Sequence, residues 1–265
     1  MIKTIAISSQ KGGVAKTTTC LSLGASLVEL GLSVLLIDMD PQANLTLSLG
    51  VNPELQRQTV GDALLEQKSL VAVSQEGPML NLDLIPANQG LVVIDKMLYG
   101  RRGYEHRLRN QLETIDRGFY DLILIDCPPA FGTLTLNALT AADLLIIPVQ
   151  CEYYAARAMR PILKLVQLVR RKTNNNLNYR VLVTMYDRRN RISQRILDQL
   201  QSGFNSALFE TIIEVDTKLR ESPTMGLPIN LYAPRTRGAR QYRALAEELT
   251  ASASREQQRK DHETS

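Results

Sequence analysis

Between residues 11 and 18 the chain reads Lys11-Gly12-Gly13-Val14-Ala15-Lys16-Thr17-Thr18, shortly after the apolar run 2–8. The apolar run predicts a strand buried on both faces, and the helical spacing of the apolar residues that follow, ended by Gly31, predicts a helix over 17–30. A glycine turn between a buried strand and a helix N-terminus can hold phosphate with its backbone N–H groups. In such a turn Lys16 can reach the β- and γ-phosphates, and the Thr17 hydroxyl can bind Mg²⁺. The order of these features predicts a nucleotide-binding phosphate loop.

This loop departs from the common pattern G-x-x-x-x-G-K-[ST] at two positions. Gln10 and Ala15 stand where that pattern has its glycines. We expect the single methyl group of Ala15, at a compatible backbone φ, to leave phosphate binding intact.

Apolar runs continue along the chain at intervals that accommodate helices. They predict strands over 34–37, 82–85, 122–125, 144–149 and 181–184. Strands that alternate with helices indicate an α/β fold, here a doubly wound, mostly parallel β-sheet flanked by helices. We expect a single domain over residues 1–250, followed by a polar segment, 251–265, that is frayed or disordered. Ligands in such folds lie beyond the carboxyl ends of the strands.

Composition narrows the class of protein. The chain has 265 residues, of which 44% are hydrophobic and 22% charged, which is typical of a globular protein and excludes collagen-like and disordered chains. No apolar run reaches the length of a membrane span, so we expect a cytoplasmic protein. The three cysteines, Cys20, Cys127 and Cys151, are far apart and lack zinc or redox spacing, so we expect buried thiols.

The net charge of +4 is unevenly distributed. Residues 1–150 hold 11 of the 31 lysines and arginines and 15 of the 27 acidic residues, a balance of −4, which leaves +8 for residues 151–265. A basic half of this kind favours a polyanionic partner, either nucleic acid or an anionic membrane.

Five ordered blocks resemble the ParA/MinD family of deviant Walker A ATPases over residues 1 to about 248. The first is the loop with its additional lysine, Lys11. The others are Asp38-Met39-Asp40-Pro41-Gln42-Ala43-Asn44, Ile125-Asp126-Cys127-Pro128-Pro129, Thr184-Met185-Tyr186-Asp187, and the stretch from Glu221-Ser222-Pro223 to Tyr242. The fourth block is the T-M-Y-D sequence typical of the ParA branch.

The resemblance implies ATP and Mg²⁺ as cofactors and a role for each motif. Residues Lys11, Gly12, Gly13, Val14, Ala15, Lys16, Thr17 and Thr18 would hold the nucleotide, and Lys11 would reach the nucleotide of a second subunit in an ATP-dependent homodimer. Asp40 would position the attacking water, which makes Lys11, Lys16 and Asp40 the catalytic set. Thr17, Asp38 and Asp126 would serve the metal, and the Gly132 amide would sense the γ-phosphate.

Two further assignments follow from the family. Met185 and Val215 are expected beside the adenine, although the family's I-P-R-N segment is replaced here by Ile213-Glu214-Val215-Asp216. Arg188, Arg189, Arg191, Arg195, Lys218 and Arg220 match the basic positions that resemble the non-specific DNA-binding surface of ParA proteins. Phosphate contacts of this kind give affinity without reading sequence.

The interpretation is a positioning ATPase that rides on the nucleoid and is stimulated by a ParB-like or McdB-like adaptor, for plasmid or chromosome partition or for carboxysome distribution. Two alternatives belong to other classes. A MinD-like division regulator needs a membrane-binding C-terminal helix, and residues 250–265 contain no Leu, Ile, Val, Phe or Trp. A reductase of the nitrogenase iron-protein type needs two cysteines at the dimer axis, whereas Cys20 falls within the first predicted helix.

Overall fold

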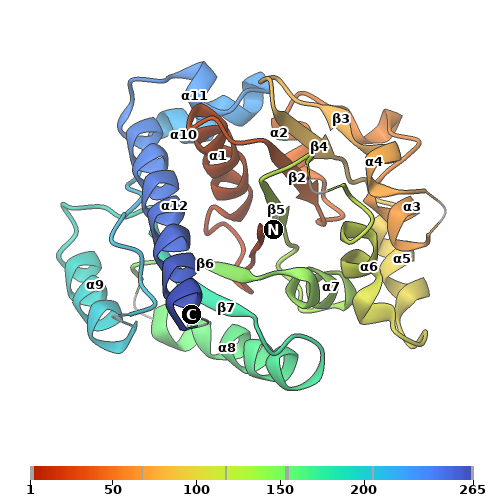
Figure 1. Ribbon diagram of the computed structural model, residues 1–265. Helices are drawn as coiled ribbons and strands as arrows, with labels where there is room; N and C mark the ends of the chain where they lie inside the picture. The colour runs from red at the N-terminus through yellow and green to blue at the C-terminus, as the bar shows by residue number, and fades with distance from the viewer. Residues whose placement is uncertain (1–2, 67, 117, 153–154, 205, 264–265) are drawn as a thin grey trace.

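The computed structural model describes residues 3–66, 68–116, 118–152, 155–204 and 206–263, with side chains for all but 156 and 253–263. Its sheet has the strand order β3-β4-β2-β5-β1-β6-β7 (Figure 1). Every pairing is parallel except that of β3 with β4. The strands are β1 (Lys3–Ile7), β2 (Val34–Asp38), β3 (Gln75–Glu76), β4 (Leu82–Ile85), β5 (Leu122–Asp126), β6 (Leu144–Gln150) and β7 (Asn178–Thr184). The predicted α/β class, with a mostly parallel sheet, is confirmed.

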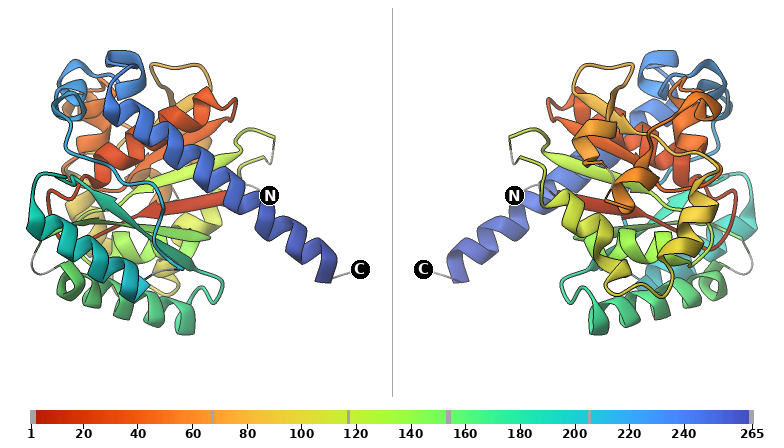
Figure 2. Two further views of the ribbon diagram at one scale, coloured as in Figure 1. Left: turned by 90° about the vertical axis from the view of Figure 1, so that its left-hand side faces the viewer. Right: turned by 90° about the vertical axis from the view of Figure 1, so that its right-hand side faces the viewer.

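Helices cover both faces of the sheet (Figure 2). Alternate residues of each strand enter different cores: Ile5 and Ile7 of β1 pack beneath one helical layer, whereas Ala6 packs beneath the other. The first layer contains α1 (Lys16–Glu29), α2 (Asn44–Ser48), α10 (Thr217–Glu221), α11 (Ile229–Tyr232) and α12 (Arg237–Glu263). The second contains α3 (Val60–Leu64), α4 (Leu70–Val73), α5 (Leu91–Leu98), α6 (Arg107–Leu112), α7 (Thr133–Ala141), α8 (Ala155–Lys172) and α9 (Arg191–Phe204).

The predicted elements agree with the observed ones to within a few residues. Helix α1 ends before Gly31, whose φ of +88° is the left-handed conformation that glycine supplies at a helix end. The largest difference is β7, which begins at Asn178, three residues before the predicted run. β7 is the last strand of the sheet, and its polar first residues, such as Asn178 and Arg180, pair with β6 at the start of the ladder.

Helix α12 continues through most of the polar segment 251–265, as far as Glu263, and its C-terminal turns extend beyond the rest of the fold (Figure 2). Sequence reasoning expected this segment to be frayed or disordered because it contains so few apolar residues. Its alanines, glutamates, glutamines and arginines are nevertheless strong helix formers, and no glycine or proline interrupts them. The division of the chain at residue 250 stays a prediction.

Cys20, Cys127 and Cys151 are free and buried, as predicted. Burial raises the pKa of the Cys151 thiol to about 11. Within the described part of the chain, no helix is both long enough and apolar enough to cross a membrane.

Candidate nucleotide-binding site

The turn between β1 and α1 forms part of the wall of a cavity of about 630 Å³. The residues of the turn that line it are Gly12, Gly13, Ala15, Lys16, Thr17 and Thr18. Helix α1 starts here with no side-chain cap and no acidic residue in its first turn. The N–H groups at a helix N-terminus have no partner within the helix and carry partial positive charge. The turn can therefore offer these groups to an anion in the cavity.

Ala15 has φ +64° and ψ 35°, which is left-handed backbone. An L-residue in this region costs about 1–2 kcal/mol, and the expectation that the Ala15 methyl group leaves phosphate binding intact stays a prediction. Neighbouring contacts hold the strained turn, because Thr19 N donates to Ala15 O at 2.9 Å and Thr184 Oγ1 donates to Val14 O at 3.1 Å. Contacts from α1 and β7 thus hold the phosphate loop in this shape.

Two carboxylates end neighbouring strands beside this loop. Asp38 of β2 and Asp126 of β5 are partners in the parallel register, and both are fully buried. Thr17 Oγ1 donates to Asp126 Oδ2 at 2.6 Å, whereas Asp126 Oδ1 has no hydrogen-bond partner among the described residues. Burial and the adjacent Asp38 charge raise the pKa of Asp126 well above its usual range. A cation at this point would offset the cost of the buried negative charge.

The residues present fit Mg²⁺. The unpartnered Asp126 Oδ1 and the Thr17 hydroxyl are oxygen ligands of the kind that this ion prefers. No group of three or more His, Cys, Asp or Glu side chains with metal-binding geometry occurs in the part of the chain that the structure describes. Mg²⁺ commonly keeps several waters and is held by few protein ligands together with substrate phosphates, so a full protein cage is not required.

Asp38 organises the turn that follows β2. Its Oδ1 accepts from Asp40 N at 3.0 Å, and its Oδ2 accepts from Thr46 N at 2.9 Å and Thr46 Oγ1 at 2.7 Å. Burial raises the pKa of Asp38 to about 6 even though these hydrogen bonds favour the ionised form. Asp40, with 7% exposure, lines the cavity, and its Oδ1 accepts from Gln42 N at 2.9 Å. Asp38 thereby holds Asp40 at the cavity wall, and its predicted metal role stays a prediction.

The two lysines of the loop have different surroundings. Lys16 lines the cavity, and its Nζ donates to Lys11 O at 3.4 Å. Lys11 is not among the described residues that line the cavity; its Nζ donates to Gln150 Oε1 at 3.1 Å and pairs with Glu152. Only Lys16 is therefore positioned for phosphates bound in this subunit's own cavity.

Met185 and Val215, expected beside the adenine, line the same cavity as the phosphate loop. Met185 has left-handed backbone, with φ +52°. Gln150 Nε2 contacts Met185 Sδ and donates to Gly13 O at 3.0 Å, so one side chain joins the loop to this wall. The cavity thus extends from the phosphate loop to both predicted base neighbours.

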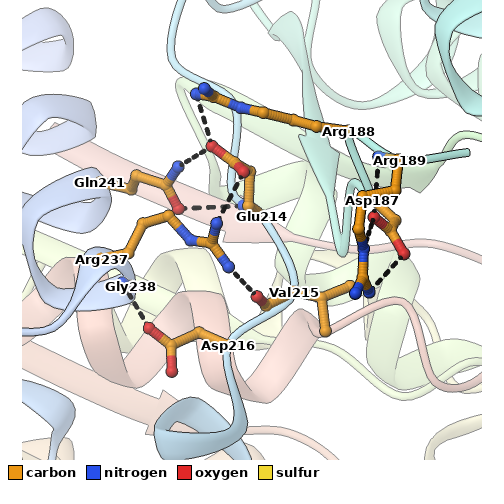
Figure 3. Close-up of polar contacts among 9 residues, drawn as sticks. All are labelled: Asp187, Arg188, Arg189, Glu214, Val215, Asp216, Arg237, Gly238 and Gln241. Carbon is orange, nitrogen blue, oxygen red and sulfur yellow. Dashed lines mark hydrogen bonds and ion pairs between the residues drawn. The ribbon is translucent and has the colours of Figure 1, made fainter.

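Glu214 is the centre of a polar network behind that wall (Figure 3). Its carboxylate is 3% exposed and is paired with Arg188 at 2.7 Å and Arg237 at 3.0 Å. Gln241 donates to Glu214 Oε1 and accepts from Glu214 N, and Arg237 also donates to Val215 O. The network ties the cavity-lining segment 213–216 to the turn after β7 and to the start of α12.

We expect Glu214→Ala to lower the free energy of unfolding by about 2 kcal/mol, because a buried acceptor of several charge-assisted hydrogen bonds is lost while the exposed arginines regain water. Urea unfolding of the ligand-free protein measures this loss. The matched control is Asp187→Ala, which removes the exposed ion pair with Arg189 on the neighbouring turn and should leave the unfolding midpoint unchanged. Equal midpoints for both variants would contradict a stabilising role for Glu214.

The six residues predicted to bind DNA fall into two separate groups. Arg188, Arg189, Arg191 and Arg195 lie on or just before α9, whereas Lys218 and Arg220 lie on α10, apart from α9 in both views (Figures 1 and 2). Three of the six have acidic partners: Arg188 pairs with Glu214, Arg189 with Asp187, and Lys218 with Glu221. Arg220 lines the nucleotide cavity. Arg191 and Arg195 are exposed and have no ion pair among the described residues.

Sequence reasoning missed three residues that shape the site. It treated Glu214 only as a departure from the family pattern, and it gave no role to Gln150 or Thr46. The sequence offered one signal for Glu214, which is an acidic residue placed between the apolar residues Ile213 and Val215. A carboxylate in such a segment can be buried, and a buried carboxylate needs cationic partners. No local pattern links Thr46 to Asp38.

The fold, the phosphate loop and the paired carboxylates define a P-loop nucleoside triphosphatase. Residues 2–179 match the family AAA_31, described as an AAA domain. Sporulation initiation inhibitor protein Soj of Bacillus subtilis (strain 168) is 42% identical over 253 residues, which cover 95% of this chain and 100% of that protein. Chromosome partitioning protein ParA of Caulobacter vibrioides (strain NA1000 / CB15N) is 38% identical over 252 residues, which cover 94% of each protein.

A solved structure has the same fold over nearly the whole chain. It is described as cobyrinic acid a,c-diamide synthase from Mycobacterium smegmatis with bound ATP analog and magnesium. It has a TM-score of 0.83 and 35% sequence identity and covers 94% of this chain and 95% of its own. This chain therefore belongs to the Soj/ParA family of P-loop ATPases, which confirms the resemblance found in the sequence.

Proposed function

We propose that this chain is a Mg²⁺-dependent ATP hydrolase that dimerises on binding ATP, binds DNA without sequence preference and positions cargo. In this scheme a ParB-like or McdB-like adaptor stimulates hydrolysis, and the protein is associated with the nucleoid. The main support is similarity to Soj and ParA over nearly the whole length of the chain. Plasmid or chromosome partition is the role that these relatives' names favour. Carboxysome distribution is the other role that is consistent with the motifs.

The chain's own residues divide the chemistry of hydrolysis. The Lys16 ammonium and the N–H groups of the loop would bind the β- and γ-phosphates, and Thr17 with Asp126 would hold Mg²⁺, which neutralises charge on the phosphates. Asp40 would accept a hydrogen bond from the attacking water. Phosphoryl transfer depends chiefly on such positioning and charge stabilisation, so this small set of groups is sufficient.

Lys11 connects hydrolysis with dimerisation in this proposal. Its side chain is 39% exposed and is held by Gln150 and Glu152 outside the cavity. An exposed ion pair of this kind contributes little stability, so Lys11 can exchange Glu152 for a phosphate of a second subunit at low cost. A cation supplied by the partner would then stabilise the charge that develops during transfer.

DNA binding in each nucleotide state tests this function. The anisotropy of labelled random-sequence duplex DNA would be measured with ADP, with ATP, and with ATP for Asp40→Ala, at about 50 and 200 mM salt. We expect binding with ATP only, longer retention for Asp40→Ala, and a logarithmic salt slope of about −0.9 per phosphate contact. Sedimentation with anionic vesicles is the parallel arm.

Two outcomes would contradict the proposal. Equal DNA binding with ADP and ATP would separate DNA binding from the nucleotide switch. Vesicle binding with ATP, without DNA binding in any state, would favour the MinD-like alternative.

A further inference from the structure

Helix α8 is basic along its whole length. The 18 residues of Ala155–Lys172 contain Arg157, Arg160, Lys164, Arg170, Arg171 and Lys172 and no aspartate or glutamate. Surface helices of soluble proteins commonly mix both signs of charge. An acid-free helix of this kind creates a strong local positive potential.

Four of these residues form one stripe, which we name the α8 basic face: Arg157, Arg160, Lys164 and Arg171. Their spacing at 3.6 residues per turn places them within about 60° of one another around the helix axis, over a length of about 21 Å. All four are exposed. None has an ion pair with an acidic side chain among the described residues; Arg171 Nε donates only to a backbone oxygen, Gln167 O, at 3.3 Å.

Packing makes this face a rigid part of the surface. The opposite side of α8 buries Met159, Ile162, Val166 and Val169 in the same core that receives α9. Ser193 of α9 contacts Cys151 O just before α8, so the N-terminal turns of the two helices lie near each other. The unpaired Arg191 and Arg195 on α9 therefore belong to the same side of the sheet (Figure 1).

We propose that the α8 basic face is a principal contact surface for the phosphate backbone of duplex DNA. This inference rests on the proposed DNA-binding function and locates it on residues that the family pattern did not indicate. Arg188, Arg189 and Lys218 must give up a carboxylate before they bind phosphate, whereas the four α8 residues need not. Phosphate binding by these four residues therefore carries no cost of breaking an ion pair, while each contact still releases a counterion from the DNA.

The shape of the face favours DNA over an amphipathic helix of a protein partner. A docked helix of that kind needs apolar anchors in a groove, and Leu168 is the only exposed large hydrophobic residue on the described part of α8. A row of cations that extends about 21 Å along the helix would instead match the phosphates of about six base pairs. Phosphate contacts of arginine and lysine position a protein on DNA without selecting a sequence.

Charge reversal on this face tests the inference. In the ATP-bound full chain, Arg160→Glu/Lys164→Glu/Arg171→Glu should weaken binding to random duplex DNA at least 10-fold and reduce the salt slope by about 2–3. The control is Arg57→Glu/Arg101→Glu/Arg102→Glu, which changes the net charge equally at exposed positions away from α8 and should retain most of the affinity. ATP hydrolysis without DNA should be unchanged in both triple variants.

A neutral triple variant controls for misfolding that charge reversal could cause. Arg160→Gln/Lys164→Gln/Arg171→Gln keeps good helix formers and should show the same reduced slope with a smaller loss of affinity. Wild-type affinity and slope in the α8 variants, or a loss no greater than in the control, would overturn the inference while leaving the proposed function intact. Absence of DNA binding by the wild type in every nucleotide state would overturn both. Normal DNA binding with lost adaptor stimulation would assign the face to a protein partner instead.

Discussion

Replacing Lys16 with alanine should reduce the single-turnover rate of ATP hydrolysis by about 10²–10³-fold, the loss typical of removing one charged or hydrogen-bonding group from a transition state. Lys16 is the lysine of the phosphate loop that lines the cavity, and among the described residues its Nζ makes one long hydrogen bond, to Lys11 O at 3.4 Å. Its ammonium is therefore available to phosphate. Release of labelled phosphate with enzyme in excess over ATP measures the rate.

Lys11→Ala is the matched comparison within the same loop. Lys11 lies against Gln150 and Glu152, so its loss should leave ATP binding to the monomer unchanged while abolishing dimerisation-dependent hydrolysis. Calorimetric titration with a non-hydrolysable ATP analogue separates the two lysines, because only Lys16→Ala should weaken binding. Equal losses of binding in both variants would show that Lys11 also serves its own subunit's nucleotide.

The parts of the site that could be predicted are marked by short local patterns. The phosphate loop comes after β1, Asp38 and Asp126 are the last residues of β2 and β5, and parallel strands bring their carboxyl ends together at one edge of the sheet. Local pattern and topology were therefore sufficient to predict that these residues lie together, whereas their roles follow from the family resemblance. The backbone of Ala15 was not predictable in the same way, because contacts with Thr19 and Thr184 hold it in a conformation that its own side chain disfavours.

The remaining features depend on pairings between distant segments. Arg188 matches a basic family position, but in the fold it is paired with the buried Glu214. Conversely, the arginines of α8 carried no motif, and they stand out because none has an ion pair with an acidic side chain in the part of the chain that the structure describes. Sequence identifies which residues are charged, whereas the fold determines which of those charges are neutralised and which remain available to a ligand.

Asp40→Ala should reduce hydrolysis about 10²-fold or more while leaving ATP binding within a few-fold of the wild type, because a carboxylate that orients or deprotonates water acts chiefly in the transition state. Asp40 lines the cavity. Its Oδ1 accepts a hydrogen bond from Gln42 N, whereas its Oδ2 accepts none from any described residue. That free oxygen is the one available to a water.

Asp40→Asn separates charge from geometry, since asparagine can still accept from Gln42 N and preserve the turn. A wild-type hydrolysis rate for Asp40→Asn would show that Asp40 shapes the turn and that its carboxylate is not needed for the reaction. Hydrolysis lost in both variants, with ATP-dependent DNA binding retained and prolonged, would place the carboxylate itself at the attacking water.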